Sequence, residues 1–346
     1  MDLFQTLQQL RFGEVHVAHD ERTGLRAIVA LHSTRLGPAI GGCRAIHYPD
    51  SGAALHDAVR LARGMSYKAA ICNLPHGGGK AVIMLPQDDD FDRQALFHHF
   101  GKFVDSLGGR YITAEDSGTS PADMDVIGAT TPHVLGTSVG GGDPSPFTAF
   151  GVRRGIEAVA AFQFERSDLD GLHVAIQGLG SVGFNLAREL HDLGCSLTVT
   201  DIRPENVQRA VESLGATAVD PDDIFAVECD IFAPCALGAV INDTTLPMLR
   251  TRAIAGAANN VLAEDRHGIE LFRKGILYAP DYAINAGGLI KVACEFIDTD
   301  ADANDIRSRV AAVHDIMTGI FERARREDVP THIVADRIAE ERIYAD

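Results

Sequence analysis

The pattern of apolar and polar positions divides the chain into two parts. In the first part, alternating or continuous apolar residues predict strands, and apolar residues at helical spacing predict helices. The expected strands cover 15–20, 25–32 and 80–85, with another beginning at 110, and the expected helices cover 2–10, 52–72 and 92–107. The apolar segment 36–49 contains Gly41 and Gly42, which indicate a bulge or a backbone that approaches a ligand closely.

A loop rich in glycine and proline separates the two parts. Residues 138–146 read SVGGGDPSP, which favours an irregular connection or a hinge. Beyond it, short apolar strands alternate with helices, which predicts a parallel sheet. We expect a helix over 147–163, strands from 172 to the glycines at 178 and over 196–201, 216–219, 230–235, 253–259 and 275–282, and a long amphipathic helix over 302–328.

These elements predict an α/β protein of two domains. An N-terminal α/β substrate domain is expected over 1–140 and a Rossmann-type, doubly wound dinucleotide-binding domain over 141–324, with a cleft between them. Helices from about 325 to 346 are expected to pack back on the first domain.

The second part contains the fingerprint of a dinucleotide-binding turn. An apolar strand runs into Gly178, Gly180 and Gly183, a helix follows, and the next strand ends at Asp201. In this context the glycines admit a pyrophosphate to the helix N-terminus, and the aspartate accepts from the ribose hydroxyls and repels a 2′-phosphate. The pattern therefore predicts NAD, with NADP as the minority alternative because Arg203 lies two residues further on.

The stretch Ser66–Lys80 is the strongest candidate for chemistry in the first part. It holds Lys68 and Lys80 and, directly before the second lysine, three glycines that indicate a turn. A second lysine nearby favours a neutral amine, because like charges repel, and a neutral amine is a usable base. The alternative is a plain glycine turn with solvated lysines. A nucleotide P-loop is excluded, because Leu74 replaces its first glycine and Ala81 its hydroxyl residue.

Polar residues at strand ends supply further candidates. Asp116 follows the strand that begins at 110, where functional loops of α/β folds lie, although a turn or helix-capping role is the competing interpretation. Asn259 and Asn260 follow a strand of the second part and are candidates for contact with the nicotinamide.

Composition and charge narrow the possible partners. The 346 residues carry a net charge of -17, which argues against nucleic acid and anionic membranes as partners. Six cysteines without a CxxC pair predict free thiols in a reducing compartment. We find neither a signal peptide nor an apolar stretch long enough to span a membrane, so a cytoplasmic location is expected. The scattered histidines and cysteines predict no metal site.

The chain resembles the Glu/Leu/Phe/Val dehydrogenase family of NAD(P)-dependent amino acid dehydrogenases, and the likeness extends over nearly its whole length. The motifs that carry it stand in the family's order: GPAIGGCR, RGMSYKAA, GGGKAVI, TAEDSGTS, SPFTAFGV, QGLGSVG, APCALGAVI, GAANNVLA and NAGGLI. The resemblance implies a homo-oligomer that oxidatively deaminates an amino acid, with domain closure before hydride transfer.

The resemblance also implies roles for individual residues. Lys68 would bind the substrate carboxylate, Lys80 would activate the water that attacks the imine, and Asp116 would transfer protons. Gly41 and Gly42 would lie beside the substrate. The implied cofactor contacts are Thr148 and Asn260 near the nicotinamide, Ala236 and Leu237 on the adenine side, and Asn259, Ser181, Val182 and Ile202 in the surrounding segments.

The substrate side chain is predicted to be apolar. Glutamate members of the family carry a lysine at the position of Ile40 and a serine at that of Val292, and Leu289 lies nearby. A second carboxylate buried there would lack a partner, at a cost of several kcal/mol. Leucine or valine is therefore expected, with phenylalanine or another aromatic amino acid as the alternative. A biosynthetic member that couples an imine to another molecule, or a non-catalytic NAD-binding protein, would share these motifs.

Overall fold

The computed structural model describes all residues except 1–2, 10, 89–90, 139–141, 299–300 and 346. Part of the glycine-rich connection thus lies outside the described residues. The chain forms two compact units: the first comprises Met1–Gly142, Glu295–Ile297 and Ile338–Asp346, and the second Asp143–Cys294 and Asp298–Arg337. The domain limits given above stay a prediction.

The first unit is built on a mixed five-stranded sheet in the order β1-β2-β4-β3-β5. Its strands are β1 (Glu14–Asp20), β2 (Leu25–Ser33), β3 (Ala39–Ile46), β4 (Gly77–Met84) and β5 (Tyr111–Glu115). β1, β2 and β4 pair antiparallel, whereas β3 is parallel to both β4 and β5. The helices are α1 (Leu3–Gln9), α2 (Ser51–Ile71), α3 (Arg93–Ser106) and α4 (Pro121–Gly128).

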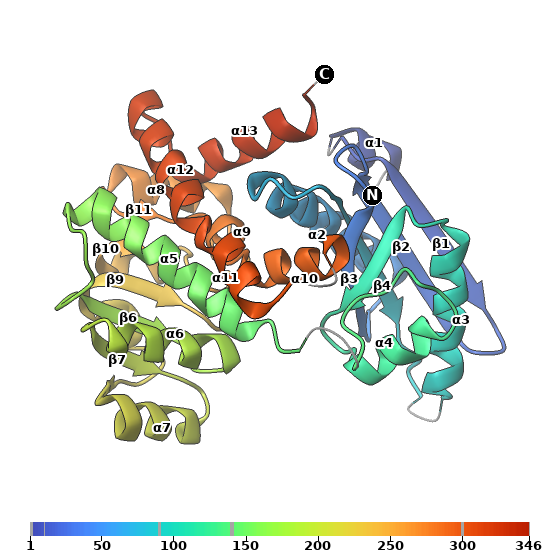
Figure 1. Ribbon diagram of the computed structural model, residues 1–346, viewed down its shortest axis with the longest axis horizontal. Helices are drawn as coiled ribbons and strands as arrows, with labels where there is room; N and C mark the ends of the chain where they lie inside the picture. The colour runs from blue at the N-terminus through green and yellow to red at the C-terminus, as the bar shows by residue number, and fades with distance from the viewer. Residues whose placement is uncertain (1–2, 10, 89–90, 139–141, 299–300, 346) are drawn as a thin grey trace. The chain divides into compact units, whose positions relative to one another are not determined.

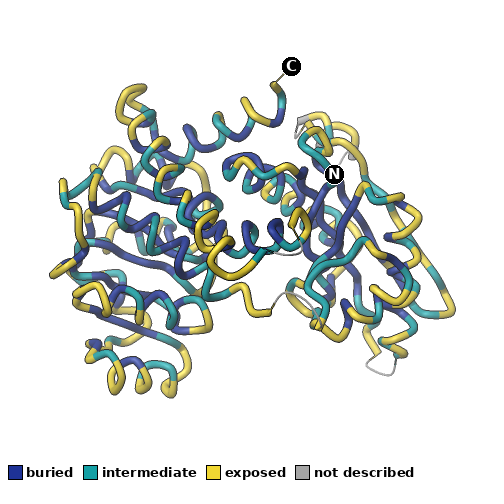
Figure 2. Tube along the Cα trace, viewed as in Figure 1, coloured by how far each residue is buried: buried dark blue, intermediate teal, exposed yellow. Residues whose placement is uncertain are grey.

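Strand alternation gives this sheet two different faces (Figure 1). Side chains such as Ala81 and Ile83 pack with Phe97 of α3, whereas Val82 and its neighbours pack with Ala62 of α2. Strand β4 is buried at all eight positions, and Figure 2 shows the strands of both units among the buried segments. A residue at an even position of β4 therefore lies on the face covered by α2.

The three glycines before Lys80 are part of β4, so the predicted turn at this place is wrong. A Cβ at Gly77 would lie 1.8 Å from the Ser33 carbonyl oxygen, and one at Gly78 would lie 1.9 Å from the Ser66 nitrogen. A Cβ at Gly79 would lie 2.9 Å from the Tyr111 ring. The glycines thus allow close packing of the strand, which begins three residues earlier than expected.

The second unit has a six-stranded parallel sheet in the order β11-β10-β9-β6-β7-β8. Its strands are β6 (His173–Gln177), β7 (Ser196–Thr200), β8 (Thr217–Ala218), β9 (Glu228–Pro234), β10 (Arg250–Ile254) and β11 (Leu277–Tyr278). The order reverses between β6 and β9, which defines a doubly wound sheet, and ligands of such sheets bind beside this point. The predicted α/β class and Rossmann-type sheet are confirmed.

Helices surround this sheet (Figure 1). They are α5 (Ser145–Phe164), α6 (Ser181–Asp192), α7 (Pro204–Leu214), α8 (Asp265–Arg273), α9 (Asp281–Ile284), α10 (Gly287–Ile297), α11 (Ala303–Ala311), α12 (Val313–Glu327) and α13 (Thr331–Ile343), with short 3-10 helices at Ile224–Ala226 and Leu246–Met248. The first unit receives residues 295–297 at the end of α10 and the C-terminal part of α13.

Three boundaries differ from the prediction. The single helix expected over 302–328 is interrupted at Ala312, although apolar residues on both sides of the break are buried. The strand expected over 253–259 ends at Ile254, because the chain then crosses the end of β9, where a Cβ at Gly256 would lie 2.2 Å from the Pro234 oxygen. The strand expected over 275–282 is reduced to two residues, because Pro280 caps α9.

Candidate active site

The structure brings Lys80 and Asp116 together in the first unit. The Lys80 amine donates a hydrogen bond to Asp116 Oδ2, and the two side chains form an ion pair. Their side chains are 8% and 21% exposed, respectively. Lys80 projects from β4 and Asp116 follows β5, so two strands separated by β3 supply the pair.

Local hydrogen bonds fix the Asp116 carboxylate. Its Oδ1 accepts from the Ser117 amide at 2.7 Å, and its own amide donates to Thr119 Oγ1 at 2.9 Å. Burial works to raise the pKa of Asp116, but the charge and hydrogen bond of Lys80 outweigh it, and the pKa lies below its usual value. Asp116 is therefore an ionised carboxylate paired with an amine.

The glycines of β3 make room for this pair. A Cβ at Gly42 would lie 2.7 Å from Asp116 Cβ, and one at Gly41 would lie 1.8 Å from the Gly79 oxygen. Ile40, directly before them, is 1% exposed. The apolar side chain predicted to replace the lysine of glutamate-specific relatives is thus buried in the same strand.

Lys68 lies in the last turn of α2, the helix that covers the face of the sheet on which Lys80 stands. It is half-buried. Two residues earlier, Ser66 contacts β4, where its hydroxyl lies 3.4 Å from the Gly78 oxygen. Both predicted lysines therefore belong to one side of one sheet.

Leu289 and Val292 lie in α10, in the second unit, and both are half-buried. Their spacing of three places them on one side of the helix. The neighbouring Lys291 is 4% exposed.

The glycine-rich turn of the second unit has the geometry of a pyrophosphate cradle. Gly178 has a positive φ of 96°, and a Cβ at Gly183 would lie 2.0 Å from the Gly178 oxygen. Among the described atoms none lies within 4 Å of a Cβ at Gly180, which caps α6 without a side-chain hydrogen bond. Exposed Ser181 and half-buried Val182 begin this helix, so open space lies before its free amides.

Asp201 stands at the end of β7, beside this turn. Its Oδ2 accepts from the Leu179 amide at 2.6 Å, and its Oδ1 accepts from the Arg203 amide at 2.8 Å. Burial works to raise the pKa of Asp201, but these backbone hydrogen bonds outweigh it, and the pKa lies below its usual value. An ionised carboxylate at this place suits ribose hydroxyls.

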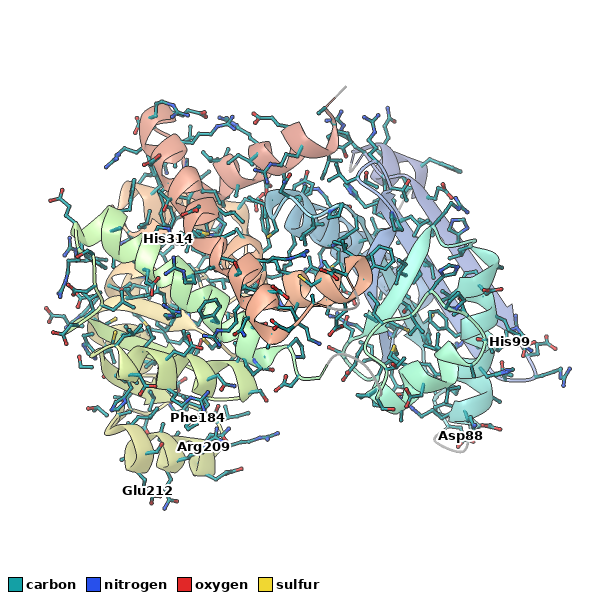
Figure 3. All side chains as sticks on the ribbon, viewed as in Figure 1. Asp88, His99, Phe184, Arg209, Glu212 and His314 are labelled. Carbon is teal, nitrogen blue, oxygen red and sulfur yellow. The ribbon has the colours of Figure 1, made fainter. Side chains whose placement is uncertain are left out.

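Arg209 on α7 also supports the glycine-rich turn, and the sequence pattern gave no reason to select it. Its guanidinium lies 3.6 Å from the centre of the Phe184 ring, and the two labelled side chains come together in Figure 3. It also donates to the Leu179 carbonyl at 3.2 Å. From the sequence, the position of this arginine in the helix after β7 is the one feature that could have indicated its contact with the turn.

The remaining cofactor candidates occupy the carboxyl-end side of the parallel sheet. Ile202 is 88% exposed and Leu237, next to exposed Ala236, is 79% exposed, which is unusual for large apolar side chains. Asn259 Oδ1 accepts from Asn285 at 2.8 Å. Asn260 has a positive φ of 52°, and its oxygen accepts from the Ala239 amide at 2.6 Å.

Thr148 lies near the start of α5, close to the N-terminus of α10. Its hydroxyl donates to the Pro144 oxygen at 3.2 Å and would lie 2.7 Å from a Cβ at Gly288. Gly288 therefore allows the two helices to approach at the predicted nicotinamide residue.

The described part of the chain holds neither a clustered metal site nor a membrane-spanning helix. No group of three or more His, Cys, Asp or Glu residues there is placed to hold a metal ion. No helix there is both long and apolar enough to cross a membrane.

A Rossmann unit with this turn, on a chain that carries a lysine–aspartate ion pair, defines a dinucleotide-dependent oxidoreductase. Two family models match: "Glu/Leu/Phe/Val dehydrogenase, dimerisation domain" over residues 10–133, and "Glutamate/Leucine/Phenylalanine/Valine dehydrogenase" over residues 199–343. The chain belongs to the Glu/Leu/Phe/Val dehydrogenase family, as its motifs predict. It is an amino acid dehydrogenase, which acts on a CH–NH2 group with a nicotinamide cofactor.

Known relatives are named for different amino acid substrates. A leucine dehydrogenase of Geobacillus stearothermophilus is 49% identical over 99% of this chain and 94% of its own. A phenylalanine dehydrogenase of Bacillus thermotolerans is 43% identical over 96% and 88%. The crystal structure of an L-tryptophan dehydrogenase from Nostoc punctiforme superposes with a TM-score of 0.88 at 43% identity, covering 99% and 98%.

Proposed function

We propose that this protein catalyses the reversible, NAD-dependent oxidative deamination of an apolar L-amino acid, of the leucine or valine type, to a 2-oxo acid and ammonia. The observation that carries the proposal is the contact of buried Lys80 with half-buried Asp116, on the face of the sheet that α2 covers. An amine and a carboxylate in contact can pass protons to and from a reacting group.

Each residue would have a distinct role. Lys68 would bind the substrate carboxylate as an ammonium group. Lys80 would remove a proton from the water that attacks the imine carbon, and Asp116 would take up that proton and return it to the leaving ammonia. The bound nicotinamide supplies the hydride acceptor for the carbon–hydrogen bond.

The proposed preference for a branched apolar side chain rests on Ile40, Leu289 and Val292. Ile40 is buried, and none of the three offers a charge to a second substrate carboxylate. An aromatic amino acid is the second candidate, because relatives 43% identical are a phenylalanine and a tryptophan dehydrogenase.

The preference for NAD over NADP rests on Asp201. A 2′-phosphate would meet its ionised carboxylate, whereas ribose hydroxyls would donate to it. Exposed Arg203, two residues after Asp201, is a cation that would favour binding of NADP. We expect kcat/KM to favour NAD in the wild type, and Asp201→Ala to reduce that preference while Lys80-dependent chemistry persists.

A substrate panel tests the proposal directly. NADH formation is measured with leucine, valine, isoleucine, phenylalanine, tryptophan and glutamate, and the reverse reaction is measured with and without ammonium. We expect the branched amino acids to give the highest kcat/KM and the reverse reaction to require ammonium. Faster turnover of glutamate would contradict the proposed pocket, and an ammonium-independent reverse reaction would indicate a biosynthetic coupling enzyme.

Lys80→Ala distinguishes an enzyme from a protein that only binds the nucleotide. We expect this variant to bind NADH as the wild type does and to lose turnover by about 10⁴-fold. Wild-type turnover in the variant would remove Lys80 from the mechanism.

We also propose that the protein is a cytoplasmic homo-oligomer. The family model that matches residues 10–133 is described as a dimerisation domain, and the six cysteines are free thiols, as expected in a reducing compartment. Light scattering after gel filtration should give a mass that is a multiple of 37.1 kDa. A monomer at working concentration would contradict the oligomer.

A further inference from the structure

Arg44 lies between two carboxylates in the first unit. It stands on β3 at an even position, like Gly42, and its Nη1 donates to Asp57 Oδ2 of α2 at 2.8 Å. Its Nε lies 3.6 Å from Asp116 Oδ2, the oxygen that also receives the Lys80 amine. Two cations therefore approach one oxygen of Asp116 from neighbouring strands.

The Arg44 Nε is buried and has no hydrogen-bond partner among the described residues. At 3.6 Å its distance to Asp116 is that of an ion pair and is too long for a good hydrogen bond. A buried donor without a partner is costly, so a small movement that closed this distance would be favourable.

Asp57 holds the other end of the guanidinium in place. Its Oδ2 also accepts from the Tyr48 hydroxyl at 2.7 Å, and its Oδ1 accepts from Arg60 at 3.2 Å. The Asp57 side chain is 17% exposed and Tyr48 is 8% exposed. Arg44 is thus anchored from the side of α2 and directed towards Asp116.

The proposed reaction needs a second cation beside Asp116. When Lys80 acts as a base it is neutral, and at that moment Asp116 loses its counter-charge while it stays largely buried. An unpaired buried carboxylate takes up a proton or moves towards water. Arg44 is a second cation in contact range of Asp116 and, unlike a lysine, keeps its charge at any working pH.

We propose that Arg44 is a positioning residue of the reaction. While Lys80 is neutral, the Nε of Arg44 bonds to Asp116 and keeps that carboxylate ionised and in place. The inference deepens the proposed deamination and rests on it for its catalytic consequence.

The groups that face Asp116 give the sign of the pH effect. β4 supplies Lys80, β3 supplies Arg44 and the buried Cys43 thiol, and α2 supplies Asp57; the more distant pair Arg93 and Asp123 joins α3 to α4. Loss of Arg44 removes a cation and leaves the negative Asp57 nearby, so the pKa of Asp116 rises. If activity needs ionised Asp116, the pH below which activity is lost then moves upwards.

Three variants test the catalytic consequence. Arg44→Met should lower kcat about 100-fold, with little change in the KM of the amino acid, and should move the acidic limb of the kcat profile up by about one pH unit. Arg44→Lys keeps the charge but cannot reach both carboxylates, so kcat should fall less and the limb should stay. Arg60→Ala is the matched control, because it removes an exposed cation from the same Asp57.

A second measurement does not depend on turnover. The infrared carboxylate band of Asp116, assigned by difference from Asp116→Asn, is titrated in Lys80→Met and in Lys80→Met/Arg44→Met. We expect Asp116 to titrate at least one pH unit higher in the double variant. Equal titration in the two would overturn the inference, as would equal loss of kcat in Arg44→Met and Arg60→Ala. An inactive wild type with the expected titration would contradict the proposed function alone.

Discussion

At the scale of single residues, the site depends on glycines, whose lack of a side chain leaves room for neighbouring groups. Gly42 has no side chain where Asp116 Cβ lies, and Gly183 has none where the Gly178 carbonyl lies. Gly42 leaves room for a carboxylate that the proposed chemistry uses, whereas Gly183 allows the start of α6 to pack closely against the turn before it. The two units therefore depend on glycine for different reasons.

Gly42→Ala should abolish most activity without unfolding the protein. The new Cβ would lie 2.7 Å from Asp116 Cβ and from the Glu115 oxygen, so Asp116 must shift away from Lys80. A displacement of about 1 Å costs roughly 100-fold in kcat. The measurement is kcat with leucine, alongside a thermal melt.

Gly319→Ala is the matched control for that substitution. Gly319 is exposed within α12, and no described atom lies within 4 Å of its added Cβ. Alanine should stabilise the helix by about 0.5–1 kcal/mol and leave kcat unchanged. Equal activity of the two variants would mean that Gly42 does not position Asp116.

Individual residues were predictable from the sequence where a motif fixes their environment. The glycines and Asp201 follow from a strand, a turn and a helix in fixed order, and the structure places them together. The contact of Lys80 with Asp116 joins residues 36 positions apart across β3, and no local pattern predicts it. Arg44 stands inside a quoted family motif, but its position between Asp57 and Asp116 depends on how α2 packs.

At the scale of elements, the C-terminal helix supports the helix that carries Lys68. Arg342 Nη1 donates to the Ala70 and Ile71 carbonyl oxygens at 2.8 and 2.7 Å, at the end of α2. The Ala70 oxygen also accepts from the Asn73 amide at 3.0 Å, and a cation at this place suits the negative end of the helix dipole. A residue near the C-terminus of the sequence thus stabilises the end of α2.

Arg342→Ala should therefore weaken substrate binding. Fraying of the last turn of α2 would release Lys68, so the KM of the amino acid should rise about tenfold, equivalent to about 1.4 kcal/mol, with a smaller change in kcat. Arg337→Ala, on the same helix but bonded to Glu327, is the control and should leave KM unchanged. A fall in kcat at constant KM would argue against this role.

The contact between α3 and α4 predicts a pH-dependent stability. Asp123 accepts two hydrogen bonds from Arg93, at 2.8 and 2.9 Å, and caps α4 through Ser120. Burial works to raise the pKa of Asp123, but the bond from Arg93 and those from Ser120 outweigh it, and the pKa lies below its usual value. A carboxyl of this kind adds stability above the unfolded pKa, about 4, and that stability is lost as pH falls through the lower folded pKa.

Asp123→Asn should therefore cost about 2 kcal/mol at pH 7 and progressively less below pH 4. Denaturant melts of both proteins between pH 7 and pH 3 measure the difference. A difference that stays constant over this range would show that the stability of the contact does not depend on the charge of Asp123.

Elements were predictable where their periodicity was strong. Helices α2 and α5 begin and end within two residues of the prediction, because the spacing of their apolar residues is clear. Strand β4 was misjudged at its start, because three glycines resemble a turn unless the neighbours that crowd them are known. Helix α4 was not expected, although its capping box of Ser120 and Asp123 was readable.

At the scale of the whole molecule, charge is the dominant property. The net charge of -17 at pH 7 means that self-repulsion opposes the folded state. Raising NaCl from 20 to 500 mM at pH 7 should screen it and raise Tm by about 3 °C. The effect should vanish near pH 5.2, the isoelectric point. A falling Tm at pH 7 would show that attractive ion pairs outweigh the net repulsion.

Strand β4 lies between β2 and β3, and every one of its residues is buried. Its amides should consequently be among the slowest in the first unit to exchange with deuterium, since they open only when that unit opens. Heat inactivation should then coincide with the loss of this protection. Selection for activity that survives heating would therefore act on the stability of the sheet that contains β4.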